Sequence, residues 1–117
     1  MRGKVVSNYG SAGGQKNDGI DIAADKGASV KAADGGTVVY AGNEVKGMGN
    51  LVLVSHNGGY ITAYGNNETL LVQKGDAVKK GQQIAKVGSG ASGEPRLHFE
   101  VRHANKTIDP MTVLPGQ

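Results

Sequence analysis

The chain is 117 residues long, with 20 glycines, 4 tyrosines, 1 phenylalanine and a formal net charge of +3. This length is enough for one domain with a hydrophobic core but leaves no room for a separate catalytic lobe. The 13 lysines and arginines are dispersed among 10 acids without an aromatic-interleaved basic stripe, which argues against nucleic-acid binding. Without cysteine no disulfide can form, and no apolar stretch approaches the roughly 20 residues of a membrane span.

Short segments rich in Val, Ile and Thr alternate with glycine turns, which predicts an all-β domain with little or no helix. In chain order, we expect strands at residues 4–9, 19–23, 29–33, 37–41, 50–56, 60–64, 70–72, 77–78, 83–87 and 97–102. The strongest hairpin signal is the Asn-Gly-Gly turn at residues 57–59.

An internal echo links residues 25–32 with 73–80, because each stretch is a lysine-glycine turn that leads toward a Val- or Ile-containing strand. If the echo is a true repeat, it predicts a small antiparallel barrel-like sandwich built on a duplicated hairpin motif. Independent hairpins with similar turns are the alternative.

Residues 95–101 (PRLHFEV) read as a two-histidine metal strand from which one histidine is missing. Residues two apart on a strand point to the same face, so a His-x-His triplet aims two imidazoles at one ion. Here the first position is Arg96 and the second is His98. A guanidinium has no lone pair to donate and keeps its charge, so Arg96 would repel the dication. The segment therefore predicts a metalloenzyme scaffold that has lost its metal chemistry.

Four ordered blocks resemble the LytM, or lysostaphin-type, zinc peptidase domain, whose active members cut peptide crosslinks of peptidoglycan. The blocks are residues 17–24, 49–56, 60–64 and 96–100, and the resemblance extends over about residues 3–115. It implies five site positions. These are the first two zinc-ligand positions Asn17 and Asp21, the catalytic positions Asn66 and Arg96, and the third zinc-ligand position His98.

Among these five positions, Asp21 and His98 keep the residue types of the active family. A catalytic zinc ion needs about three protein ligands and an open position. The amides Asn17 and Asn66 neither ligate strongly nor act as a general base near neutral pH. We therefore expect no metal, no other cofactor and no enzyme activity. The pattern is similar to the degenerate, non-catalytic LytM proteins typified by NlpD, EnvC and DipM, which activate peptidoglycan amidases at bacterial division sites.

This resemblance implies a regulator in the periplasm or cell envelope that binds an N-acetylmuramoyl-L-alanine amidase or another cell-wall hydrolase, and possible contact with peptidoglycan itself. Residues 1–117 are expected to be a single degenerate LytM domain excised from a longer protein. The vestigial active site would serve as the partner-binding groove. Its expected residues are Asn17, Asp21, Asn66, Arg96 and His98, with Tyr60 and Tyr64 beside them and Met48 on the rim.

Two other functions and several structural roles compete with this hypothesis. A peptidoglycan-binding or weakly active zinc endopeptidase would need a third donor beside Asp21 and His98. A biotinyl or lipoyl carrier would need a lysine at a hairpin tip, whereas Lys79 and Lys80 lead into a strand. In purely structural terms, Asp21 could hydrogen-bond a loop, His98 could be a satisfied core residue, and Arg96 could pair with Glu100 on the same strand face.

Overall fold

The computed structural model describes residues 19–88, 93–103 and 106–110, without the side chain of Lys106, and the backbone alone of residues 4–7, 10–12 and 15–17. The predicted all-β class is confirmed: this part of the chain contains strands and one 3₁₀ turn, η1 (Asn57–Gly59). The strands are β1 (Lys4–Ser7), β2 (Gly10–Ala12), β3 (Gln15–Asn17), β4 (Ile20–Ala23), β5 (Ser29–Lys31), β6 (Gly36–Gly42), β7 (Asn50–Ser55), β8 (Tyr60–Leu70), β9 (Ala77–Val78), β10 (Gln83–Val87), β11 (Arg96–His103) and β12 (Lys106–Ile108). In the described part, no helix is long and apolar enough to cross a membrane.

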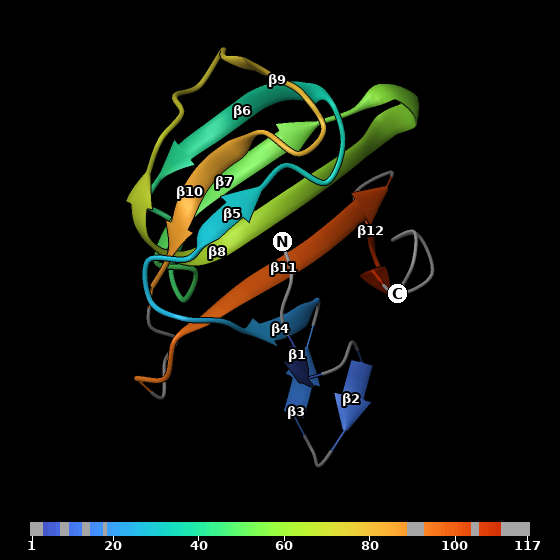
Figure 1. Cartoon of the computed structure of the whole chain (residues 1–117). Coiled ribbons are helices and arrows are strands. Elements are labelled where there is room, and N and C mark those ends of the chain that lie inside the picture. The colour runs from blue at the N-terminus through green and yellow to red at the C-terminus, as the bar shows by residue number, and fades with distance from the viewer. Residues whose placement is uncertain are drawn as a thin grey trace.

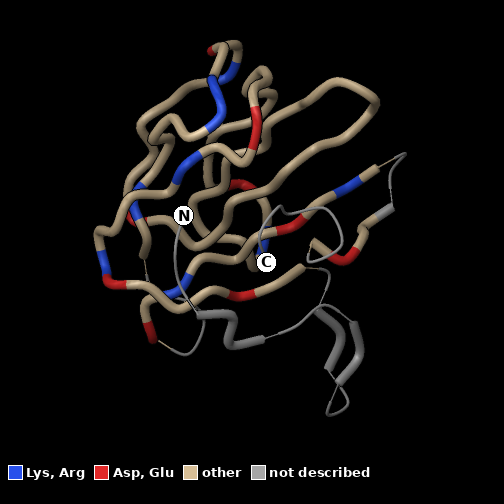
Figure 2. Tube along the Cα trace, turned by 45° about the vertical axis from the view of Figure 1, so that its right-hand side comes forward, with Lys and Arg blue, Asp and Glu red and all other residues tan. Residues whose placement is uncertain are grey.

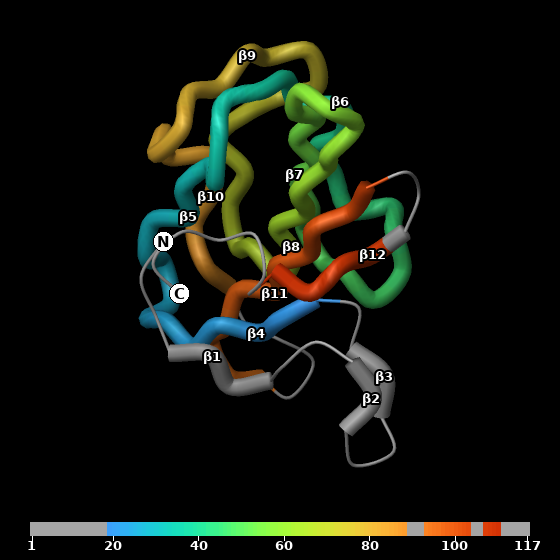
Figure 3. The backbone as a smooth tube through the Cα atoms, turned by 90° about the vertical axis from the view of Figure 1, so that its right-hand side faces the viewer, coloured from blue at the N-terminus to red at the C-terminus, as the bar shows by residue number. Residues whose placement is uncertain are grey.

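One antiparallel sheet contains most of these strands, in the order β1-β4-β11-β8-β7-β6-β9 (Figure 1). Strand β12 pairs with β11 at one side, and β10 pairs with both β8 and β5. As a result β5 and β10 fold over one face of the sheet, where Figure 3 shows them beside β7 and β8. The short β2–β3 hairpin forms a separate two-stranded unit.

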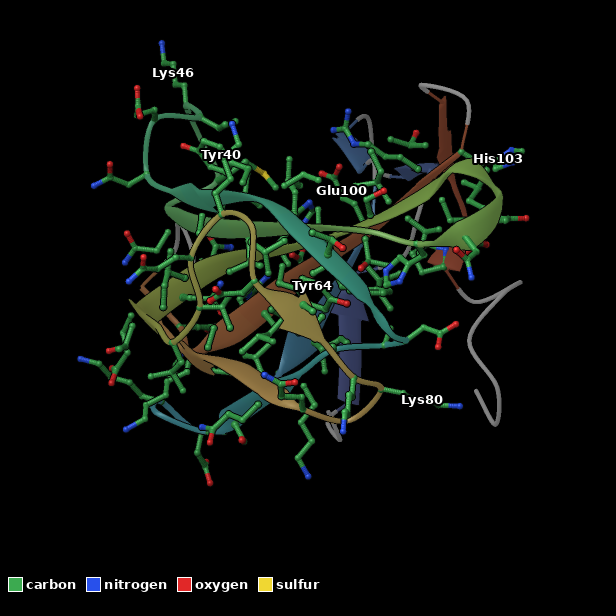
Figure 4. All side chains as sticks on the ribbon, turned by 90° about the horizontal axis from the view of Figure 1, so that it is seen from above. Tyr40, Lys46, Tyr64, Lys80, Glu100 and His103 are labelled. Carbon is green, nitrogen blue, oxygen red and sulfur yellow. The ribbon has the colours of Figure 1, made fainter. Side chains whose placement is uncertain are left out.

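The hydrophobic core lies between the main sheet and the β5–β10 pair. Strand alternation produces it: on β11, Leu97, Phe99 and Val101 are buried, while the residues between them point to the opposite face. The largest fully buried core side chains include Ile20, Val30, Val54, Tyr64 and Ile84. The opposite face of β11 carries the polar residues of the candidate site, and Figure 4 shows Glu100 on the other side of the sheet from Tyr64.

The predicted hairpin at residues 50–64 is confirmed as β7, η1 and β8, but β8 runs on to Leu70 instead of ending at Tyr64. The extension has a physical cause, because residues beyond Tyr64 pair with β10, for example Leu70 with Ala85. A separate strand at residues 70–72 was therefore wrong, and β12 was not predicted. Acidic and basic residues are interspersed along the described trace, as the sequence indicated (Figure 2).

Candidate functional site

Antiparallel pairing of β4 with β11 brings Asp21 and His98 together, although 77 positions separate them in the sequence. The two residues are direct register partners, and His98 Nδ1 lies 2.8 Å from Asp21 Oδ1. Each side chain is 16% exposed. The two residues that the resemblance implies as zinc-ligand positions thus meet on the polar face of the sheet and bond to each other.

The contact continues along β11 as a chain of alternating charges. His98 Nε2 lies 2.8 Å from Glu100 Oε2, and Arg102 donates from Nε and Nη2 to Glu100 Oε1 at 3.1 and 2.7 Å. The Glu100 side chain is 5% exposed, whereas that of Arg102 is 45% exposed. We call Asp21, His98, Glu100 and Arg102 the charged chain. Sequence reasoning missed Arg102, although residues 96, 98, 100 and 102 share one strand face by their even spacing.

The charged chain favours a protonated His98, because both ring nitrogens then donate to carboxylates. Burial opposes the charged imidazole, but hydrogen bonds and charge attraction from Asp21 and Glu100 outweigh it and raise the pKa of His98 to about 9. Burial likewise opposes the Glu100 carboxylate, yet its bonds to His98 and Arg102 lower the pKa of Glu100. The site is therefore a paired set of two cations and two anions near neutral pH.

This pairing predicts how the free energy of unfolding of the metal-free chain depends on pH. The folded pKa of His98 lies above the ordinary histidine value of 6.5, so its contribution is fully present below pH 6.5 and is lost as the pH rises through about 9. The Glu100 contribution has the opposite sign: it is present above the ordinary glutamate pKa of 4.5 and is lost in acid. We expect unfolding free energy to fall by on the order of 2 kcal/mol between pH 6.5 and 9.

Urea unfolding at several pH values measures this dependence, with His98→Gln as the control because it cannot titrate. The variant should lose most of the decline between pH 6.5 and 9. An equally steep decline in His98→Gln would show that another group causes it.

Arg96 points to the same face of β11 but stands apart from the charged chain. Its Nη2 donates to Glu94 Oε2 at 2.9 Å, and the Glu94 side chain is 72% exposed. The Arg96 Nε is buried and has no hydrogen-bond acceptor among the residues that the structure describes. The alternative that Arg96 pairs with Glu100 was wrong, because the Glu100 carboxylate bonds to His98 and Arg102 instead.

Asn66 occupies an irregular point in β8, next to the residue that pairs with His98. Gly65 is the register partner of His98, and Asn66 follows it with φ of 64°, in the left-handed region that few non-glycine residues adopt. Its backbone N–H donates to Met48 O at 2.8 Å. Asn66 is half-buried, and its expected role in the groove stays a prediction. Asn17 ends β3, and its side chain lies outside the described part, so its expected place in the groove stays a prediction.

The expectation that two tyrosines flank the groove needs correction. Tyr64 is 1% exposed, and its hydroxyl bonds to Thr62 Oγ1 and accepts from Ala33 N–H inside the core. Tyr60 pairs with His103, near the opposite end of β11 from Arg96, and its ring centroid lies 4.4 Å from that of His103. Even spacing placed the two rings on one face, but that face is the core for Tyr64, and Tyr60 is at the far end of the strand.

The loop between β6 and β7 forms a wall of the site. A Cβ on Gly65 would lie 3.3 Å from Met48 Cε and 3.6 Å from His98 Cβ, so the Met48 methyl group sits over Gly65 near His98. The loop is tied to the sheet by Tyr40, whose hydroxyl accepts from Glu44 N–H at 2.8 Å. Met48 thus borders the site, as the sequence suggested.

The donor set does not fit a catalytic zinc ion of the resembled family. In the part of the chain that the structure describes, no three His, Cys, Asp or Glu side chains are arranged to hold a metal. His98 directs both ring nitrogens at carboxylates, and the positions that the resemblance implies as catalytic hold an amide at Asn66 and a cation at Arg96. A zinc ion would have to displace the His98 proton and break one of these bonds.

A family model described as peptidase family M23 matches residues 15–110. The chain belongs to peptidase family M23. Among curated relatives, this M23 chain is 46% identical over 113 residues to the murein hydrolase activator NlpD of Escherichia coli K12, covering 97% of this chain and 30% of NlpD. It is 48% identical over 115 residues to the lipoprotein YgeR of the same organism, covering 98% and 45%. The M23 chain spans less than half the length of these relatives.

Solved structures of M23 peptidases share the fold. The antimicrobial peptidase lysostaphin from Staphylococcus simulans superposes with a TM-score of 0.87 at 34% identity, covering 96% of this chain and 49% of lysostaphin. The catalytic domain of the M23 protein EnpA from Enterococcus faecalis gives 0.84 at 29% identity, covering 97% and 92%. The chain therefore shares its fold with proteins named as peptidases, while relatives of higher identity include proteins named as activators.

Proposed function

We propose that this M23 domain is a non-catalytic regulator that binds and activates a peptidoglycan amidase during cell division and cell-wall remodelling, in the periplasm or cell envelope. The observation that carries the proposal is the charged chain, in which His98 bonds to two carboxylates instead of presenting a free nitrogen. The name of NlpD, a murein hydrolase activator, supports the same conclusion.

A peptidase of this family would need a metal-activated water and a group that moves its proton. At the position implied for proton transfer, Asn66 offers an amide that does not titrate near neutral pH. Arg96, at the other catalytic position, keeps its proton and adds positive charge where a dication would bind. Hydrolysis is thus left without its nucleophile and without its base.

The same face has the features of a protein-binding surface. Asp21, Arg96 and His98 lie on one face of β4 and β11, and the Met48 methyl group borders them. Asn66 directly follows Gly65, the register partner of His98. Arginine and methionine are common in interfaces because one pairs bidentately with carboxylates and the other adapts its shape. In the activation mechanism implied by the family resemblance, the groove receives a regulatory helix of the amidase and so opens the amidase active site.

The alternative, a peptidoglycan-binding or weakly active zinc endopeptidase, is favoured by one observation. Asp21 and His98 remain adjacent at two of the three implied ligand positions. With a third donor, these two residues would hold zinc. The experiment below separates the two functions.

Restoring the missing histidines tests whether the implied positions converge. The wild-type chain should hold well under one zinc ion per molecule and should not cleave crosslinked peptidoglycan. Asn17→His, Asn66→His and Arg96→His together should raise zinc affinity, because three or more donors then face one point. Metal analysis after dialysis and a sacculus-cleavage assay measure both outcomes.

Adding Asp21→Asn to the triple variant is the matched control, and it should remove the gain in zinc affinity. Stoichiometric zinc and chelator-sensitive cleavage in the wild type would reject the non-catalytic function. No gain in the triple variant would show that the family positions have been carried over wrongly.

A further inference from the structure

The two arginines of the polar face of β11 are held in different ways. Arg102 makes two hydrogen bonds to the carboxylate of Glu100, which is 5% exposed. Arg96 makes one hydrogen bond to the carboxylate of Glu94, which is 72% exposed. Arg102 is therefore fixed by a buried partner, whereas the partner of Arg96 is surrounded by solvent.

The ion pair that holds the Arg96 guanidinium in the free chain is weak. An exposed ion pair contributes little to stability, because water competes for both charges and the side chains lose freedom. In addition, Arg96 Nε is buried without an acceptor in the described part of the chain, which is an unfavourable state for a charged donor. Exchange of Glu94 for a better acceptor would thus cost the guanidinium little.

Both ends of the row carry partly exposed arginines, and one of them, Arg96, is paired with the exposed Glu94 carboxylate. The acids Asp21 and Glu100 are 16% and 5% exposed and bond to cations, whereas Arg96 and Arg102 are 23% and 45% exposed. A partner that displaces Glu94 therefore meets arginines at both ends of the row and neutralised acids between them. This arrangement complements an acidic surface.

We propose that Arg96 is a receptor for a carboxylate of the partner protein, and that Glu94 occupies this receptor in the free chain as an internal competitor. The proposal rests on the proposed function, because it takes the partner to be the amidase. On binding, the partner carboxylate replaces Glu94 and engages two donors of the planar guanidinium. The adjoining Met48 methyl group favours a protein segment with an apolar side chain next to its acid.

The test measures the affinity of three variants and one control for a purified N-acetylmuramoyl-L-alanine amidase by titration. Glu94→Gln should tighten binding about two- to fivefold, since it removes a weak exposed competitor. Arg96→Gln should weaken binding at least about tenfold, and Glu94→Gln should have no further effect in the Arg96→Gln background. Asp34→Asn is the control, because it removes the same charge at a turn where Asp34 accepts from Gly35 N–H.

Sedimentation with purified sacculi runs in parallel. Tighter amidase binding by Glu94→Gln alone supports the proposal, and equal effects of Glu94→Gln and Asp34→Asn overturn it while the proposed function stands. Tighter binding to sacculi instead would identify a carboxylate of peptidoglycan and overturn the protein partner. If the wild-type chain binds no amidase, the proposed function fails and the competitor role fails with it.

Discussion

Arg96→Ala is expected to reduce affinity for the amidase by about 2 to 5 kcal/mol, because the partner carboxylate would be left buried and unpaired. Lys46→Ala, in the exposed loop beside Met48, should reduce the affinity by much less. Its effect should be on the association rate and on the salt dependence of binding. Binding and amidase stimulation for the two variants measure the difference.

Thermal unfolding of both variants controls for a damaged fold. Arg96 bonds to an exposed carboxylate and not to Glu100, so Arg96→Ala should leave stability nearly unchanged. Wild-type binding and activation by Arg96→Ala would reject Arg96 as the anchor of the groove.

Glu100→Gln is expected to destabilise the fold by about 3 kcal/mol, because it removes the shared anion between two cations in a buried network. The change should also lower the pKa of His98, since Glu100 is one of the two carboxylates that raise it. Chemical unfolding measures the first effect and NMR titration of His98 measures the second.

Glu44→Gln is the matched control, because Glu44 is exposed and its backbone, not its carboxylate, bonds to Tyr40. It should shift stability by less than about 0.5 kcal/mol. A similar small shift for Glu100→Gln would mean that the charged chain does not stabilise the fold.

Much of the fold could be predicted from strand alternation and turn residues. The segment 97–102 alternates apolar and polar side chains, and β11 indeed buries Leu97, Phe99 and Val101. The meeting of Asp21 with His98 followed from family resemblance, since nothing local links two residues so far apart. Local sequence patterns thus predict the strands, whereas the family resemblance predicts which distant residues come together.

The remaining differences have physical causes that a linear reading misses. Even spacing put Tyr60 and Tyr64 on one face, but it could not show that this face is the core. The positive φ of Asn66 was also hidden, because asparagine, unlike glycine, gives no clear signal of a left-handed residue. The ion partners of Glu100 were ambiguous, since arginines at positions 96 and 102 are both on its face.

The most direct test of a non-catalytic activator is the release of peptide from purified peptidoglycan by the amidase, measured with and without this chain. The chain is used either untreated or after treatment with a zinc chelator, and the chelator is removed before the amidase is added. We predict that the chain alone releases no product and that chelator-treated and untreated chain stimulate the amidase equally. Peptidoglycan cleavage by the untreated chain alone, abolished by chelator and restored by zinc, would contradict this account.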